Sequence, residues 1–220
     1  LYRVLSEQHS ELKLSQASKK NIADLALNNT FTVTTGHQLC LFTGPLYFIY
    51  KIIHTIKLCQ TLKTKYPEQN FVPLFWMASE DHDFEEIASV VVNQQKITWE
   101  LNANQAPVGR LQTDTLAPLI SELGQILGDG ASAKSIQTLV NKCYAKGENL
   151  ASATRKLVYD LFGKHGLVIL DGDSPELKRS FAPLIKKELL EQFSLKALTT
   201  QSEALAKLFK TQISPRNINL

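Results

Sequence analysis

Three short apolar runs along the chain predict β-strands, at residues 31–35, 71–77 and 166–171. The first run is β-branched and aromatic, the second (FVPLFWM) is continuously apolar, and the third (GLVILD) ends in an acidic residue. A continuous apolar run is typical of a strand that is covered on both faces. We therefore place Trp76 in the core, and Trp99 further along the chain is assigned there as well.

Between and beyond these runs, apolar residues recur at three- and four-residue steps, which predicts helices. A long buried helix is expected from Pro45, in its first helical position, to about Lys63. An amphipathic helix is expected at 150–162, with Asn149 as its N-cap. Further helices are predicted near 11–28 (on the surface), 112–127, 131–146, 175–192 and 195–210, and one or two more strands within 87–101.

This order of strands and helices, interrupted by an insertion, is that of an α/β fold with a parallel sheet. Right-handed crossovers would place the loops after Thr35, Met77 and Leu170 at one edge of that sheet. In open parallel sheets, ligands bind outside the carboxyl ends of the strands. Because three polar clusters of this chain follow these strands, we expect a ligand-binding or catalytic domain.

Composition excludes several classes of protein. Of 220 residues, 44% are hydrophobic and 20% are charged, which excludes a disordered chain. The net charge of +3 is small and spread along the chain, which argues against nucleic-acid binding. Three cysteines without a CxxC motif indicate a reducing, cytoplasmic compartment, and no apolar run is long enough to span a membrane.

The first polar cluster surrounds the end of the first strand and the start of the long helix. A helix N-terminus offers unpaired N–H groups and a partial positive charge, which suits a phosphate or a carboxylate. Gly36 and Gly44 would let the backbone approach such an anion closely, and Lys51 would add charge. The alternative is a tight loop with a proline helix start, an incidental histidine and a surface lysine. The candidate substrate- or phosphate-binding residues are Thr35, Gly36, His37, Gln38, Gly44, Pro45, Tyr47 and Lys51.

The second polar cluster, at residues 79–83, directly follows the second strand. Its ionisable groups suit binding a divalent cation or an amine, or acid–base chemistry. Neighbouring side chains point in different directions, so at most two or three converge on one atom. The alternative is a solvated acidic loop in which Ser79 or Asp81 caps the next helix. The candidate catalytic residues are Glu80, Asp81, His82 and Asp83, with Ser79 as a substrate contact, and no dedicated metal site is predicted.

The third polar cluster follows the third strand. Asp171 comes immediately after the apolar run and is a candidate substrate contact. Asp173 or Ser174 is expected to cap the helix that begins at Pro175. The cysteines, including Cys40 beside the first cluster, are assigned to packing.

Three stretches resemble the signatures of a known family. Residues 31–51 (FTVTTGHQLCLFTGPLYFIYK), 72–87 (VPLFWMASEDHDFEEI) and 166–185 (GLVILDGDSPELKRSFAPLI) are similar to the bacillithiol-biosynthesis cysteine-adding enzymes, a family of cysteine ligases. The resemblance implies a Rossmann-like core of the nucleotidyltransferase or class I aminoacyl-tRNA synthetase type, with an inserted, mixed segment. It also implies that Thr35 to Gln38 take the place of the synthetases' phosphate-contacting loop, and that residues 79–83 line the opposite side of the pocket.

The resemblance further implies the activity and the partners. Cysteine would be added to the amine of glucosaminyl-malate, with ATP or ADP and Mg²⁺ as cofactors and with ATP activating the cysteine carboxyl group as an adenylate. Full-length members carry a C-terminal coiled coil, and a cytoplasmic homodimer is expected, with small-molecule partners and neither nucleic acid nor membrane.

The expected organisation has four segments: an N-terminal helical segment (1–30), the first half of the Rossmann-like core (31–90), an inserted connecting segment (91–149), and a return to the core with C-terminal helices (150–220). Because full-length family members are longer, we expect an incomplete domain here. The alternative function is a non-catalytic, truncated Rossmann-like binding module. A metal-dependent hydrolase using residues 79–83 is a weaker option.

Overall fold

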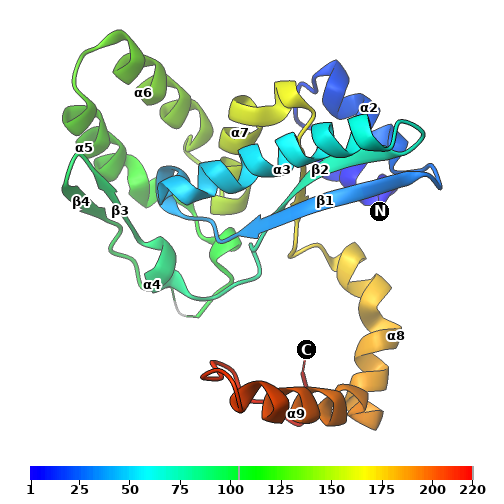
Figure 1. Ribbon diagram of the computed structural model, residues 1–220. Helices are drawn as coiled ribbons and strands as arrows, with labels where there is room; N and C mark the ends of the chain where they lie inside the picture. Colours follow the sequence, from blue (N-terminus) through cyan, green and yellow to red (C-terminus); the bar gives the residue numbers. More distant parts are fainter. Residues whose placement is uncertain (104, 220) are drawn as a thin grey trace. The chain divides into compact units, whose positions relative to one another are not determined.

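A computed structural model of the protein describes residues 1–103 and 105–219 (Figure 1). The chain divides into two compact units, Leu1–Asp173 and Ser174–Leu220, which are described separately below. The division into four segments that the sequence suggests remains a prediction.

The first unit is built on a three-stranded parallel sheet, which confirms the predicted α/β class. Its strands are β1 (Thr30–His37), β2 (Asn70–Met77) and β5 (Val168–Asp171), in the order β1-β2-β5. In the register of this sheet, His37 pairs with Met77 and Met77 with Asp171, so all three strands end level with one another. The first strand does not end at Thr35 as predicted, because Gly36 and His37 continue the ladder opposite Trp76 and Met77.

Helices α3 (Leu46–Lys65) and α7 (Leu150–Phe162) connect the strands, and α3 lies over β1 and β2 (Figure 1). Pro45 is the N-cap of α3 and not its first helical residue. Helix α7 has the predicted bounds, and Asn149 caps it by accepting a hydrogen bond from the Ser152 N–H at 2.8 Å. Its buried residues, among them Leu150 and Leu157, face the core.

The insertion between β2 and α7 forms a lobe of its own beside the sheet (Figure 1). It contains the short helix α4 (Phe84–Ile87), an antiparallel hairpin of β3 (Ser89–Val92) and β4 (Gln95–Thr98), and helices α5 (Ala117–Leu127) and α6 (Ala131–Cys143). The one or two strands expected at 87–101 are therefore two. Asn93 and Gln94 turn the hairpin with positive φ angles of 47° and 65°, as a two-residue turn between twisted strands requires.

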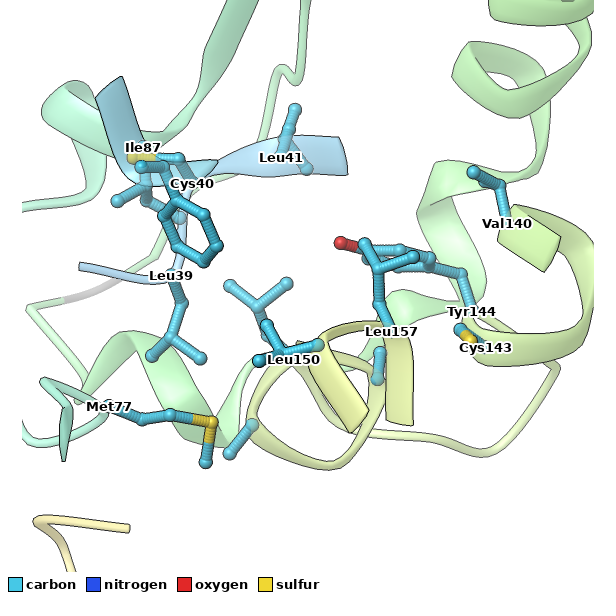
Figure 2. Close-up of a cluster of buried hydrophobic side chains, with 14 of the residues drawn as sticks. Leu39, Cys40, Leu41, Met77, Ile87, Val140, Cys143, Tyr144, Leu150 and Leu157 are labelled. Carbon is cyan, nitrogen blue, oxygen red and sulfur yellow. The ribbon is translucent and has the colours of Figure 1, made fainter. Parts of the chain in front are cut away.

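A single apolar core joins the sheet, α3, α7 and the insertion. Leu39 and Leu41, in the loop after β1, belong to the same buried cluster as Met77 of β2 and as Leu150 and Leu157 of α7 (Figure 2). The loop that carries the first polar cluster is thus anchored to the core by its own buried apolar side chains. This attachment holds the polar residues of the loop in place at the edge of the sheet.

Helices α1 (Tyr2–Gln8) and α2 (Gln16–Asp24) pack on the sheet, and α1 closes the outer edge of β5. The Gln8 side chain accepts a hydrogen bond from the Asp171 N–H at 2.9 Å and donates one to the Asp171 carbonyl at 3.3 Å. His9 Nε2 accepts from the Ile169 N–H at 3.1 Å. Side chains thereby replace a neighbouring strand, which leaves β1 as the edge at which the described sheet is open.

The second unit consists of helices α8 (Pro175–Glu191) and α9 (Phe193–Ala206) and the segment after them. Ser174 caps α8 by accepting from the Leu177 N–H, so of the two caps expected there, Ser174 is the right one. The buried Glu188 accepts hydrogen bonds from Ser194 and Asn219, which ties the end of the segment to both helices. Within the described residues, no helix is both long enough and apolar enough to cross a membrane.

Candidate functional site

The three polar clusters meet at the carboxyl edge of the parallel sheet. Gln38, one residue beyond β1, donates a hydrogen bond from Nε2 to Asp81 Oδ2 at 2.9 Å and also contacts the Glu86 carboxylate. The Ser79 hydroxyl donates to Asp171 Oδ1 at the end of β5. Segments that are far apart in the sequence are therefore linked side chain to side chain, as the predicted topology requires.

Asp81 organises the loop after β2. Its Oδ1 accepts from the N–H groups of His82 at 2.7 Å and Asp83 at 3.2 Å, while Oδ2 accepts from Gln38. These hydrogen bonds, that of Gln38 first, lower the pKa of the Asp81 carboxyl group. The side chain is therefore a carboxylate at neutral pH and a poor proton donor.

Asp83, and neither Ser79 nor Asp81, caps the next helix. Its Oδ1 accepts from the Glu86 N–H at 3.3 Å at the start of α4, so both caps expected from the sequence are wrong. Ser79 is buried and has turned toward β5 instead. Glu80 and His82 are exposed, and their side chains make no hydrogen bond with any other residue that the structure describes.

Backbone groups from the insertion hold this loop in place. The Val108 N–H donates to the Asp81 carbonyl at 2.7 Å, and the Gly109 N–H donates to the Ser79 carbonyl at 3.0 Å. A Cβ atom on Gly109 would lie 2.6 Å from Ser79 Cβ, so only glycine fits at this approach. Nothing in the sequence pattern indicates that Gly109, more than 25 residues further along the chain, supports the loop.

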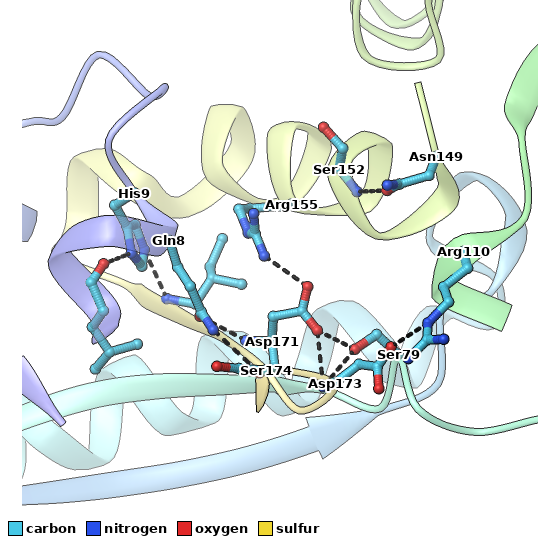
Figure 3. A network of polar contacts seen from close by, with 12 residues as sticks. Gln8, His9, Ser79, Arg110, Asn149, Ser152, Arg155, Asp171, Asp173 and Ser174 are labelled. Atoms are coloured by element: carbon cyan, nitrogen blue, oxygen red, sulfur yellow. Dashed lines mark hydrogen bonds and ion pairs between the residues drawn. The ribbon is translucent and has the colours of Figure 1, made fainter. Parts of the chain in front are cut away.

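Asp171 is the centre of a charged network (Figure 3). Its Oδ2 accepts from Arg155 Nη2 at 2.8 Å, and its Oδ1 accepts from the Asp173 N–H at 3.1 Å. Arg110 Nε donates to Asp173 Oδ2 at 2.7 Å. Neither arginine is predicted from the sequence as a site residue. Nothing in the pattern of α7 or of the 108–110 turn indicates that these side chains lie next to the third strand.

His37 lies on the α3 side of the sheet, between the rings of Tyr47 and Phe48, each 5.1 Å away between ring centroids. Its Nδ1 lies 3.0 Å from the Gln38 carbonyl, so the neutral ring donates there and keeps Nε2 as an acceptor. Burial is the main reason that the pKa of His37 is lowered, and the nearby Lys51 lowers it further. His37 is therefore neutral at pH 7.

The start of α3 offers fewer anion-binding groups than predicted. The Gly44 N–H donates to the Leu41 carbonyl at 2.7 Å, and Pro45 has no N–H. Gly44 is needed for the turn itself: it has a φ of +55°, and its Cβ would lie 2.4 Å from Cys40 Cβ. Lys51 Nζ donates to the Gly36 carbonyl at 2.6 Å, at the end of β1.

The first-turn N–H groups of Leu46 and Tyr47 have no hydrogen-bond partner within the described part of the chain. Thr35 lies one residue before Gly36 and is half-buried. The anion-binding groups at this position are thus two amides and one ammonium group.

The cysteines fit the packing role assigned to them. Cys40, Cys59 and Cys143 are buried and free. Burial raises the pKa of each thiol to about 11. Although Cys40 Sγ lies 3.7 Å from His37 Nδ1, its thiol stays protonated at neutral pH.

One residue assigned to the core lies at the surface. Trp99 is 2% exposed, as expected, but Trp76 is 37% exposed at the carboxyl end of the central strand.

No group of three or more His, Cys, Asp or Glu side chains among the described residues is arranged to hold a metal ion.

A parallel α/β sheet with helices packed on it and polar clusters gathered at its carboxyl edge defines the class of Rossmann-like domains. Residues 1–220 match the sequence model of "Bacillithiol biosynthesis BshC, N-terminal Rossmann-like domain". The chain belongs to this family, which confirms the resemblance and the Rossmann-like fold expected from it.

Curated relatives carry the name "Putative cysteine ligase BshC". The protein of Flavobacterium johnsoniae is 49% identical over 220 residues, which are 100% of this chain and 41% of the relative. That of Christiangramia forsetii is 44% identical over 224 residues (100% and 42%), and that of Cytophaga hutchinsonii is 41% identical over 217 residues (98% and 40%). The chain thus spans about two fifths of the length of these relatives.

Proposed function

We propose that this chain forms part of the active site of a carbon–nitrogen ligase that joins cysteine, through its carboxyl group, to the amine of glucosaminyl-malate. The observation that supports this most is the link between Gln38 and Asp81, which brings the first two polar clusters to one edge of the sheet. The family name of the relatives supplies the reaction class, and the other details are inferred from chemistry.

The start of α3 is the proposed anion subsite. The N–H groups of Leu46 and Tyr47 and the Lys51 ammonium group lie around it. These groups fit a nucleotide phosphate or a substrate carboxylate. ATP, when bound, would supply the activation of the cysteine carboxyl group. Preorganised N–H donors stabilise the charge that develops there, typically by a few kcal/mol per donor.

His82 is the proposed general base. Of the four candidate catalytic residues, Asp81 and Asp83 each accept a backbone hydrogen bond within their own segment through a carboxylate oxygen. His82 is exposed and has no hydrogen-bond partner among the residues described, so its ring is free to accept the proton that the attacking amine loses. Mg²⁺ usually needs only one or two protein carboxylates besides phosphate oxygens, and Asp83 would provide one.

The test is product formation from cysteine, glucosaminyl-malate and ATP by the full-length protein, with and without Mg²⁺. We expect His82→Ala to lower kcat at least about 100-fold, the usual contribution of a general base. Asp83→Asn is expected to raise the Mg²⁺ concentration needed for half-maximal rate. Glu68→Gln, at the opposite edge of the sheet, is the matched control and should be silent.

If the wild-type protein makes no product, the ligase proposal fails. If it makes product and His82→Ala is as fast as wild type, His82 is not the base.

A further inference from the structure

Trp76 is exposed where the fold normally buries a side chain. Side chains alternate along β2, so Phe75 and Met77 enter the α3 core while Trp76 projects from the opposite face. Val72 and Leu74 on that face are buried, but Trp76 remains 37% exposed. A large aromatic ring at the carboxyl end of a central strand lies where ligands of such sheets bind.

Glycines leave the surroundings of this indole open. Gly36, paired with Trp76 across the sheet, is exposed and presents no side chain beside it. Gly172 lies on the other side, and a Cβ atom there would be 2.8 Å from Trp76 Nε1 and 2.4 Å from Glu80 Oε2. The indole and the Glu80 carboxylate therefore both converge on Gly172, and any side chain at that position would force them apart.

Glu80 supplies a charge to this place. Its side chain is exposed, and none of the described residues donates a hydrogen bond or an ion pair to its carboxylate. The neighbouring carboxylates Asp81, Asp83 and Asp171 all have such partners. Glu80 therefore has both of its carboxylate oxygens available to a positively charged ligand group.

We infer that Trp76 and Glu80 form a subsite for a primary ammonium group of the substrate. A carboxylate next to an aromatic face binds ammonium groups through ion pairing and cation–π attraction. A nucleotide would bring anionic phosphates toward Glu80, which is unfavourable. The inference rests on the proposed function, whose two substrates, cysteine and an amino sugar, both carry such a group.

The position of this subsite separates it from the proposed anion subsite. His37 and the start of α3 lie on one face of the sheet, and Trp76 lies on the other, although both are at the same edge. A substrate lying across the edge would place its anionic end toward α3 and its ammonium end toward Trp76.

Calorimetric titration of the full-length protein tests this inference. The ligands are cysteine, glucosamine, and their counterparts without the amine, 3-mercaptopropionate and glucose. We expect Trp76→Leu and Glu80→Gln each to weaken the binding of an amine-bearing ligand about tenfold, and the binding of its amine-free counterpart less than twofold. If the variants lose affinity for cysteine alone or for glucosamine alone, the result identifies which substrate occupies the subsite.

Gly172→Ala tests the same subsite sterically and should weaken the binding of the same amine-bearing ligand. Gly130→Ala is the control, since no atom lies within 4 Å of a Cβ at that position. An equal loss of affinity for ligands with and without the amine, or a loss of affinity for ATP only, would overturn the inference. Acrylamide quenching compared between the wild-type protein and Trp76→Leu isolates the fluorescence of Trp76, and a Trp76 contribution that acrylamide does not quench would also overturn the inference.

The outcome is separable from that of the ligase proposal. If product forms at the wild-type rate in Trp76→Leu and Glu80→Gln, and amine affinity is unchanged, the subsite is wrong and the ligase stands. If amine affinity depends on both residues and no product forms with the wild-type protein, the subsite stands and the ligase proposal fails.

Discussion

Gln38 and Asp81, 43 residues apart in the chain, are joined by a 2.9 Å hydrogen bond from an amide to a carboxylate. The same amide contacts Glu86, so one neutral side chain lies between two negative ones. Its removal would leave two carboxylates facing each other, and like charges at such distances repel. The hydrogen bond thus joins the loops after β1 and β2 and also shields their charges from each other.

Gln38→Leu should therefore raise the pKa of Asp81 and loosen the loop after β2. We expect kcat/KM for product formation to fall about 10- to 100-fold, because a hydrogen bond to a charged group contributes about 1.5–3 kcal/mol. The pKa of Asp81 can be followed by NMR of its carboxyl carbon. Gln60→Leu, on the exposed side of α3, is the control. An unchanged Asp81 pKa would show that Gln38 is not its main partner.

Gly109→Ala should destabilise the fold through the loop that carries the second cluster. The new Cβ would lie 2.6 Å from Ser79 Cβ and 2.9 Å from the Ser79 carbonyl oxygen, and the backbone must move to admit it. Overpacking of this kind costs about 1–3 kcal/mol in the free energy of unfolding, measured by urea denaturation. Gly130→Ala, at the N-cap of α6, forms no new contact and should change the free energy of unfolding by less than about 1 kcal/mol. Equal stability of the two variants would contradict the contact between Gly109 and Ser79.

Arg155 and Asp171 should show a larger coupling energy than a surface ion pair. Both side chains are only 18% exposed, and Asp171 also accepts a hydrogen bond from the Ser79 hydroxyl. A double-mutant cycle with Arg155→Met and Asp171→Asn should give a coupling of about 1–3 kcal/mol in the free energy of unfolding. The same cycle for Lys20 and Asp24, where the lysine is largely exposed, should give less than about 0.5 kcal/mol. Similar values for the two pairs would show that solvent screens Arg155 as well.

The sequence predicted the framework of the fold well because periodicity reports directly on burial. The three core strands, α7 with its Asn149 cap, and the meeting of the clusters at one sheet edge all follow from local patterns and from the handedness of crossovers. The first strand continues beyond its predicted end at Thr35, since a glycine tolerated inside a ladder looks the same in sequence as one that ends it.

What the sequence could not provide depends on tertiary contacts. Trp76 belongs to an apolar run, and its exposure depends on which helices cover that face of the sheet. Arg155 becomes a partner of Asp171 only once α7 is laid beside β5. Helix α1 lies within the helical segment predicted at 1–30, but the pairing of its last residue and of His9 with the edge of the sheet depends on tertiary contacts that the sequence does not show.

His9 should make the fold sensitive to mild acid. The ring is 1% exposed, Nδ1 lies 2.7 Å from the Leu5 carbonyl, and Nε2 accepts from the Ile169 N–H. A second ring proton would point at that N–H group, so the folded state requires the neutral ring. Burial, the main cause, lowers the pKa of His9 to about 4.

Because the unfolded chain binds a proton at His9 near pH 6.5 and the folded chain does not until about pH 4, stability falls as pH decreases between these values. The free energy of unfolding should drop by about 3 kcal/mol over that window in the wild-type protein. The profile of His9→Gln should be flatter, keeping the smaller contribution of His37, which has the same sign. The exposed His165→Gln is the control, and parallel wild-type and His9→Gln profiles would show that another group carries the acid sensitivity.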